Sequence, residues 1–221
     1  MKCFFYFLIS LFLINTSNAG VIIGGTRVIY NEGKKDVNIS VENPDDIPYL
    51  IQAWIDNIDE KKQSSFTITP PLFRLNSNNS NTLRILLTEE SLPSDRESLF
   101  WLNIKTIPAT EKIENALQIA FKTQMKLIYR PKILKNISFN DEQQKLEWSK
   151  SGNKISVKNP TPYFINFQMI KFNGQSVNDV SYVAPFSTRS FDINNEEKNG
   201  TINWEIINDY GGTVELSEKK I

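Results

Sequence analysis

The chain has 221 residues, with 25 Lys and Arg against 25 Asp and Glu, one cysteine and no histidine. Without histidine, neither a Ser-His-Asp nor a Cys-His catalytic arrangement can form, and the commonest metal ligand is missing. The single cysteine, Cys3, can make neither an internal disulfide nor a Cys-rich zinc site. The balanced charge gives no overall attraction to nucleic acid or to an anionic membrane. We therefore expect a binding or structural protein, or an enzyme that works with carboxylates and hydroxyls alone.

Residues 1–19 have the pattern of a cleaved secretory signal. Lys2 precedes an apolar run at residues 3–14, and small residues stand where a cleavage before Gly20 requires them. A transmembrane anchor is the weaker alternative, because a run of this length cannot cross about 30 Å of hydrocarbon. Cleavage would also remove Cys3, so the exported protein would depend on its core and not on disulfides.

The remaining residues have the pattern of β-strands. Segments rich in Val, Ile, Phe, Tyr and Trp alternate with a period of two and are separated by Asn, Asp, Gly and Pro. No window of about twelve residues shows a convincing helical period. The strands predicted in chain order are residues 27–30, 36–41, 49–55, 83–87, 99–104, 117–129, 154–157, 163–167, 189–193 and 202–207.

The pattern breaks once, at residues 130–136, where a basic stretch containing a proline lacks alternation. We therefore predict an all-β protein with two sandwich domains, residues 20–134 and a smaller one at residues 135–221, after the signal at residues 1–19. Residues 76–81, which are all Asn or Ser, are predicted to be a polar turn. The proline pairs at 70–71 and at 160 and 162 are predicted to mark turns or sheet switches, for which a cis bond is one option.

The longest alternating segment, residues 115–129, allows two interpretations. Its large residues share one face: Leu117, Ile119, Phe121, Thr123, Met125 and Leu127. The pattern alone favours a central strand of the sandwich core. The alternative is an edge strand that offers alternate side chains to a partner by β-strand addition. The segment far exceeds the usual strand length of about 5–6 residues, which indicates that it overhangs its own sheet.

Seven short motifs follow one another along the chain: GTRVIY at residues 25–30, PYLIQAWI at 48–55, TPPLFRL at 69–75, DRESLFW at 95–101, KLIYRP at 126–131, NPTPY at 159–163 and INDYGG at 207–212. In this order they resemble the periplasmic pilus-assembly chaperones, the PapD-like family. The resemblance covers essentially the whole chain after the signal. Each motif alone is weak, but seven in the expected order are specific.

The resemblance implies two immunoglobulin-like β-sandwich domains in a boomerang arrangement, with a cleft between them. Such a chaperone binds a pilus subunit, an immunoglobulin-like domain that lacks its last strand, and fills the gap by donor-strand complementation in the periplasm. The residues that match the inserted strand are Leu117, Ile119 and Phe121. The subunit then passes to an outer-membrane usher. The resemblance implies no enzymatic activity, no ATP and no metal or other cofactor, and the sequence has no phosphate-binding loop motif.

By match to the family motifs, Arg27 and Lys126 lie in the cleft and bind the C-terminal carboxylate of the subunit. Two cations 4 Å apart repel by about 4 kcal/mol at an effective dielectric constant of 20, and a carboxylate between them reverses this repulsion into attraction. Anchoring also fixes the register of the added strand, since a slip of one residue would turn its side chains away from the groove. Without the resemblance, both cations would be read as ordinary solvated strand charges.

Three more charges, Glu97, Arg130 and Asp209, resemble an internal bridge of the family that fixes the angle between the domains. Treated as surface ion pairs, they would add only about 0–1 kcal/mol to stability, so we assign them to orientation. The segment between residues 103 and 115 is short and free of cysteine. It resembles the branch of the family with a short loop there, which mostly serves rod-like, adhesin-tipped pili.

Two other classes of function stay open at this point. An immunoglobulin-like surface adhesion or carbohydrate-binding module would share the sandwich, but it gives no reason to pair Arg27 with Lys126. A hydrolase with two carboxylates would need candidates such as Asp56 and Asp59 to face a cleft, whereas we expect them in a polar turn. The sequence leaves open which subunits are bound and whether the free protein associates with itself through the exposed strand.

Overall fold

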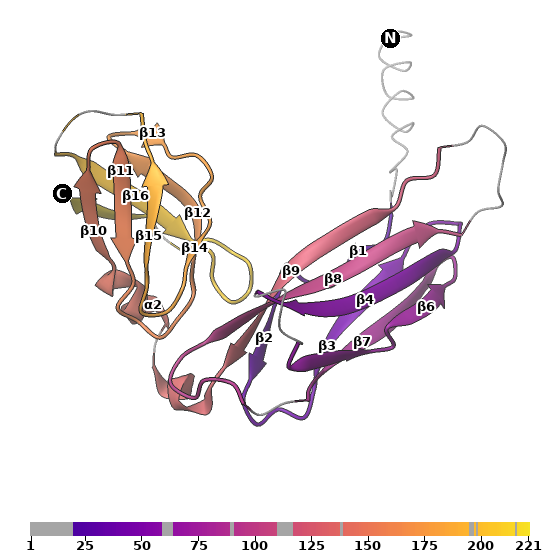
Figure 1. Cartoon of the computed structure of the whole chain (residues 1–221). Helices are drawn as coiled ribbons and strands as arrows, with labels where there is room; N and C mark the ends of the chain where they lie inside the picture. The colour runs from indigo at the N-terminus through magenta and orange to yellow at the C-terminus, as the bar shows by residue number, and fades with distance from the viewer. Residues whose placement is uncertain are drawn as a thin grey trace, which may run out of the picture.

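Two β-sandwiches, each with its own core, form the computed structural model, which describes residues 20–58, 64–88, 91–109, 117–137, 139–194, 197, 199–214 and 216–221. Figure 1 shows the C-terminal sandwich, orange to yellow, set at an angle to the N-terminal sandwich in a boomerang-like arrangement. The signal predicted at residues 1–19 lies outside the described residues. Within the described ranges, no helix is long and apolar enough to cross a membrane.

The N-terminal sandwich packs a four-stranded sheet against a five-stranded sheet. The first sheet has the order β1 (Ile22–Ile23), β3 (Val37–Asn43), β7 (Asn79–Leu87) and β5 (Phe66–Thr69). The second has the order β2 (Arg27–Asn31), β9 (Phe121–Arg130), β8 (Ser98–Pro108), β4 (Tyr49–Asn57) and β6 (Leu72–Leu75). Alternate residues of both sheets face one core, in which Val41, Ile51, Leu83 and Leu102 are fully buried.

The C-terminal sandwich has the same construction with shorter strands. Its three-stranded sheet has the order β10 (Glu147–Ser151), β11 (Lys154–Lys158) and β15 (Thr188–Asp192). Its other sheet has the order β13 (Gln175–Ser176), β12 (Ile165–Phe172), β16 (Thr201–Ile206) and β17 (Ser217–Lys220), with β14 (Tyr182–Val183) also paired to β12. Ile155, Val157, Ile165 and Trp204 lie in its core. These observations confirm the predicted all-β, two-sandwich fold.

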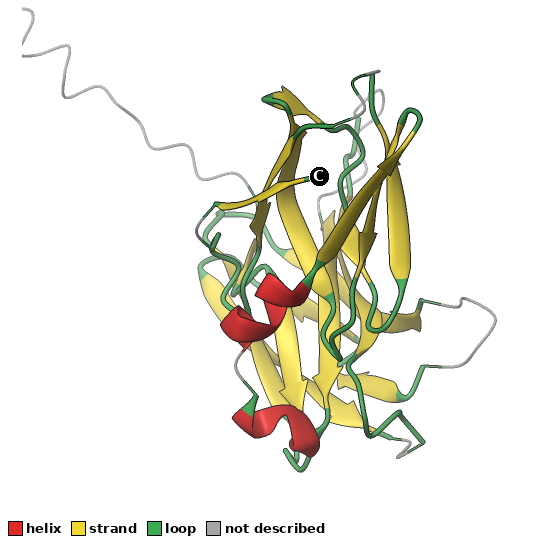
Figure 2. Ribbon diagram, turned by 90° about the vertical axis from the view of Figure 1, so that its left-hand side faces the viewer, coloured by secondary structure: helices red, strands yellow, loops and turns green. Residues whose placement is uncertain are grey.

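Short helical turns connect the domains, shown in red in Figure 2. They are η1 (Lys132–Asn136), α2 (Phe139–Glu142) and η2 (Gln143–Lys145). Pro131, which has no N–H for a ladder, follows the last residue of β9 directly. The hydroxyl of Tyr163 donates to the carbonyls of Leu134 and Ile137, each at 3.0 Å, and so fastens η1 to the second domain.

A third apolar cluster joins the two sandwiches. Its buried members are Leu99 and Ile128 from the N-terminal domain and Phe164 from the C-terminal domain, and Ile29, Tyr182 and Ala184 pack against them. On β9, Leu127 faces the N-terminal core, and the next residue, Ile128, faces this cluster. The sheet that contains β2, β8 and β9 is therefore apolar on both faces where the domains meet.

Pro70-Pro71 marks a sheet switch, as predicted. β5, before the prolines, pairs with β7 in one sheet, and β6, after them, pairs with β4 in the other. The Thr69–Pro70 peptide bond is cis. The predicted polar turn at residues 76–81 is wrong in its second half, because Asn79 already begins β7 and pairs with Asn43 of β3. Pairing with a neighbouring strand overrides the low strand propensity of asparagine there.

β9 is shorter than the predicted segment and has two different halves. Residues 115–116 lie outside the described part, and residues 117–120 form no strand. From Lys126 to Arg130, β9 pairs with β2 on one side and β8 on the other. From Phe121 to Met125, the ladders of the described chain join it to β8 alone. The second half is therefore a central strand, and the first half lies at an edge of the sheet within the described chain. Addition of this edge to a partner stays a prediction.

Candidate functional site at the domain junction

The parallel pairing of β2 with β9 places two cations side by side. Arg27 stands opposite Lys126 in the ladder. An Nη1 donor of Arg27 reaches the carbonyl of Ile207 at 3.2 Å, and Nζ of Lys126 donates to Oδ1 of Asn166 at 2.5 Å. Both acceptors belong to the C-terminal domain. The structure therefore brings the two cations that the sequence singled out to the junction of the domains.

A third cation, Arg189 on β15, joins this pair, and no sequence motif had indicated it. Its Nη1 donates to the carbonyl of Tyr182 at 2.9 Å, and its guanidinium lies 5.3 Å from the centroid of the Tyr182 ring. Nζ of Lys126 lies 5.1 Å from the centroid of the same ring. One aromatic ring thus contacts cations from both domains, an arrangement that favours their positive charge.

The cationic cluster of Arg27, Lys126 and Arg189 is electrostatically strained. Burial lowers the pKa of Lys126 to about 8, and the positive charges of Arg27 and Arg189 act in the same direction. Burial also lowers the pKa of Arg27, an effect that the charges of Asp209 and Glu97 partly oppose. Nε of Arg27 is buried and has no hydrogen-bond partner among the described residues. An anion placed among these groups would supply the acceptor and relieve the repulsion.

Arg130 bridges two carboxylates beside this cluster. Its Nε donates to Oε1 of Glu97 at 2.7 Å, and its Nη1 and Nη2 donate to the two oxygens of Asp209 at 2.6 and 2.8 Å. The second oxygen of Glu97 accepts the backbone N–H of Phe164 at 2.8 Å. Glu97 and Arg130 belong to the first domain, whereas Asp209 and Phe164 belong to the second. The three predicted bridge residues therefore do meet across the junction.

This bridge is largely buried, and the prediction of surface ion pairs is wrong. The side chain of Glu97 is 1% exposed and that of Arg130 13% exposed. Burial raises the pKa of Glu97 to about 7, although Arg130 and the N–H of Phe164 act in the opposite direction. Burial alone would lower the pKa of Arg130, but the hydrogen bonds and charges of Asp209 and Glu97 raise it overall. The bridge therefore bears on stability as well as on orientation.

A tight turn positions Asp209. Oδ1 of Asn208 accepts the backbone N–H groups of Tyr210 and Gly212, both at 3.0 Å. Gly211 has a φ of +84°, and a Cβ there would come within 2.1 Å of Oγ1 of Thr26. Only glycine allows this turn to pack against the residue that precedes Arg27.

The three residues that match the family's donor strand are all exposed. Leu117 is 87% exposed, Ile119 53% and Phe121 63%. Phe121 begins the edge half of β9, whereas Leu117 and Ile119 precede the strand. Between them, Nε2 of Gln118 donates to the carbonyl of Pro108 and holds the segment near the end of β8.

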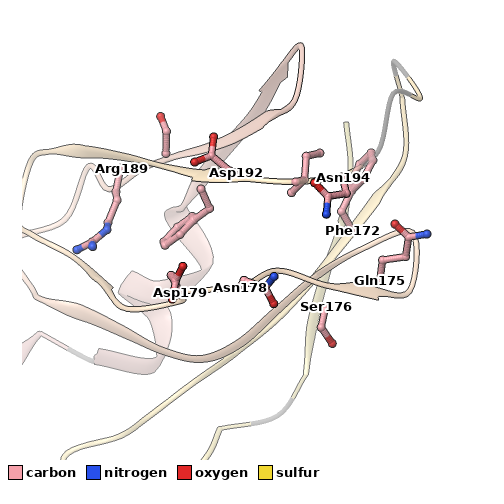
Figure 3. Close-up of a pocket in the computed structure, with 11 residues that line it drawn as sticks. Phe172, Gln175, Ser176, Asn178, Asp179, Arg189, Asp192 and Asn194 are labelled. Carbon is pink, nitrogen blue, oxygen red and sulfur yellow. The ribbon is translucent and has the colours of Figure 1, made fainter.

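A cavity in the C-terminal sandwich is a candidate for a different function. A cavity of about 440 Å³ in the C-terminal sandwich has Phe172 and Phe191 among its lining residues, with Gln175, Asn178 and Asp179 around them (Figure 3). Arg189 lines it, but neither Arg27 nor Lys126 does.

The carboxylates suggested for a hydrolase do not form a site in the described part of the chain. Asp56 lies on β4 and not in the polar turn expected for it. Its Oδ2 accepts hydrogen bonds from Trp54 and Asn103. Asp59 lies outside the described residues. Asp56 is therefore used within its own sheet.

Comparison with known proteins identifies the family. Residues 20–135 match the family described as Pili and flagellar-assembly chaperone, PapD N-terminal domain, and residues 141–218 match Pili assembly chaperone PapD, C-terminal domain. The chain belongs to the PapD-like family of pilus-assembly chaperones. The predicted resemblance is thereby confirmed, and the adhesion or carbohydrate-binding alternative is not favoured.

The relatives match over most of their own length. The chaperone protein FocC of Escherichia coli is 43% identical over 209 residues, which cover 92% of this chain and 91% of FocC. FimC of E. coli K12 is 40% identical over 200 residues, which cover 88% of this chain and 82% of FimC. Among solved structures, that of the Salmonella enterica SafA pilin in complex with the SafB chaperone matches with a TM-score of 0.84 and 34% identity, and covers 94% of this chain and 99% of the matched one.

Substitution of Arg130 should be far more destabilising than substitution of Asp209. Arg130→Met leaves Glu97 buried without its cation, which should lower the free energy of unfolding by about 3–5 kcal/mol. Asp209→Asn removes the more exposed partner, 32% exposed, and should cost about 1 kcal/mol or less. Denaturant unfolding of both variants measures the difference. Equal effects would contradict the buried bridge, and the double variant Arg130→Met/Glu97→Gln should recover part of the loss.

Neutralising Lys126 should stabilise the free protein at neutral pH. An unfolded lysine keeps its proton up to its ordinary pKa of 10.5, whereas folded Lys126 releases it near 8. Its charge therefore opposes folding below pH 8, and the penalty fades as the pH rises toward 10.5. Lys126→Met should raise the Tm by about 2–4 °C at pH 7 and by less at pH 10. Lys122→Met, on the exposed half of the same strand, is the control and should change the Tm little. If Lys126→Met left the Tm at pH 7 unchanged or lowered it, the charge of Lys126 would not oppose folding.

Proposed function

We propose that this protein is a periplasmic chaperone that binds pilus subunits, caps them by donor-strand complementation and passes them to an outer-membrane usher. The observation that carries the proposal is the cationic pair of Arg27 and Lys126 at the middle of β9, whose first half is, within the described chain, paired on one side only. Membership of the PapD-like family and the names of the relatives support the same function. The signal pattern at residues 1–19 supports export to the periplasm.

The anchor in this proposal is the C-terminal carboxylate of the subunit. A carboxylate is acceptor-only and can take a hydrogen bond from the ammonium of Lys126 and another from the guanidinium of Arg27. It would have to compete with Asn166 and the carbonyl of Ile207, which are neutral acceptors. The exchange favours the carboxylate, because its full negative charge attracts both cations more strongly than the partial charges of an amide or carbonyl oxygen do.

The first half of β9 then serves as the added strand. Between Phe121 and Met125 its backbone pairs with β8 on one side. The other side, which pairs with no strand of the described residues, would offer N–H and C=O groups to a subunit. Phe121 lies five positions before the anchor at Lys126, a span of roughly 17 Å. The exposed side chains of Ile119 and Phe121 would fill the groove of the subunit, and the fixed anchor would set which of its pockets each one enters.

We propose no covalent reaction and no cofactor. When a subunit binds, its surface replaces the water at the exposed half of β9 and the neutral acceptors at the two anchor cations. The driving force of binding is burial of apolar area, at about 25 cal/mol per Å², together with the ion pairs at the anchor. Release of the subunit at the usher would then require another strand that binds the subunit's groove more tightly than β9 does.

The anchor can be tested by coexpression with a candidate pilus subunit. The wild-type protein should protect the subunit in the periplasm as a one-to-one complex. Arg27→Ala and Lys126→Ala should each weaken the complex roughly thirtyfold or more, because each leaves a charged partner unpaired. Lys220→Ala, an exposed lysine on β17 and not on β9, is the control and should bind normally. Absence of any wild-type complex would refute the chaperone function, whereas normal binding by both anchor variants would refute the anchor alone.

The edge can be tested separately. Phe121→Asp and Ile119→Asp place a charge where a subunit's apolar groove is expected, and each should reduce complex formation at least about tenfold. Because both side chains are exposed, the free energy of unfolding of the chaperone should change by less than about 0.5 kcal/mol. Recovery of the complex by pull-down, with thermal unfolding as the folding check, measures both quantities. Wild-type levels of complex would contradict the donor-strand role.

A further inference from the structure

The outside of the bend carries an unpaired basic surface. Three lysines line one cavity of about 610 Å³ beside η1, namely Lys34, Lys132 and Lys135. Each lysine is exposed, and the structure gives none of their ammonium groups a hydrogen bond or an ion pair within the described chain. The cavity is also lined by Glu32 and Arg130, and Arg130 is already occupied by Glu97 and Asp209.

An apolar side chain projects beside these lysines. Ile133, between Lys132 and the buried Leu134, is 67% exposed. We call Lys34, Lys132, Ile133 and Lys135 the elbow surface. A single exposed apolar residue is ordinary, but Ile133 lies between Lys132 and Lys135 in the sequence, and an apolar side chain beside unpaired cations is the composition of surfaces that lie on anionic membranes.

The elbow surface is rigidly held. Leu134 packs into the C-terminal core, and its carbonyl accepts the hydroxyl of Tyr163. The backbone N–H of Lys132 donates to a carboxylate oxygen of Glu32 at 2.6 Å, which ties η1 to the turn that carries Lys34. These contacts keep Leu134 inward and Ile133 outward. No loop needs to become ordered for the surface to meet a flat partner.

The position of the elbow surface leaves the subunit site free. In Figures 1 and 2, η1 lies at the lower end of the molecule, on the outside of the bend. In Figure 1, β9 rises from there along the upper side of its sheet, and the edge half of the strand, which starts at Phe121, is the half farther from η1. A partner at the elbow would therefore not compete with a subunit at β9.

We propose that the elbow surface binds the phosphate headgroups of an anionic membrane, with Ile133 inserted among them. We choose this occupant for its charge complementarity. The three lysines have no partner of their own among the described residues, and each lysine near an anionic lipid surface strengthens binding about fivefold. The balanced charge of the whole chain excludes a general attraction, but not a local one. Such docking holds the chaperone at a membrane surface, where exported chains emerge, and it does not depend on the anchor at Arg27.

Vesicle sedimentation with the protein purified from the periplasm tests this proposal. Vesicles of phosphatidylcholine with added phosphatidylglycerol should bind the protein, and vesicles of phosphatidylcholine alone should not. Lys34→Gln/Lys132→Gln/Lys135→Gln should weaken the partition coefficient about a hundredfold, and Ile133→Asn should weaken it about tenfold. Added salt should abolish binding, because it screens charges beyond about 10 Å at 0.1 M.

Two controls distinguish membrane docking at the elbow from a general effect of charge and from binding of free phosphate. Lys154→Gln/Lys158→Gln/Lys220→Gln removes the same charge from the C-terminal sandwich and should bind anionic vesicles as the wild type does. Inorganic phosphate should compete no better than chloride at equal ionic strength. Equal losses in the two triple variants, specific competition by phosphate, or no binding to anionic vesicles would each overturn the proposal. Subunit binding by the elbow variants should stay normal, so failure here is distinct from failure of the chaperone function.

Discussion

The rest of the structure depends on the parallel pairing of β2 with β9. A sandwich can be built from antiparallel strands alone. The parallel pair of β2 and β9 places Arg27 and Lys126 in adjacent positions, where both side chains reach acceptors of the second domain. Two cations at one place repel, and burial makes each harder to keep charged. The free protein holds this arrangement because the apolar cluster of Leu99, Ile128 and Phe164 and the bridge of Arg130 hold the domains together around it.

The bridge and the cationic cluster are electrostatically complementary. Glu97 and Asp209 partly offset the lowered pKa of Arg27, and Arg189 adds to the lowering at Lys126. The junction thus has carboxylates on one side and unneutralised cations on the other. A partner that supplies a carboxylate would complete it and relieve the repulsion among the cations.

Much of the fold was predictable because the signal was local. Period-two alternation located most of the strands, and the prolines at 70–71 marked the change of sheet. The start of β9 was not predictable, because alternation continues through residues 117–120 although no strand forms there. The polar run that begins β7 was missed for the opposite reason, since its pairing with β3 is a tertiary contact that composition does not reveal.

The site was harder to predict from the sequence than the fold. Arg27, Lys126 and the bridge residues were singled out only through the family motifs, since a charged residue on a strand is usually solvated. Arg189 carried no such signal and becomes visible only where β15 and β14 come together in space. Asn166, a polar residue within the apolar run of residues 164–167, was a local clue to a buried polar contact. The burial of Glu97 could not be read from a single chain position, because it depends on the second domain.

Binding of a terminal carboxylate at the junction is the feature on which the proposed function depends most. It can be measured by calorimetry on the unaltered protein, with a peptide of a pilus subunit's C-terminal strand and the same peptide carrying a C-terminal amide. The amide should bind at least about thirtyfold more weakly, because it loses charge-assisted hydrogen bonds worth about 2–5 kcal/mol. Equal affinities for the two peptides would contradict carboxylate anchoring by Arg27 and Lys126.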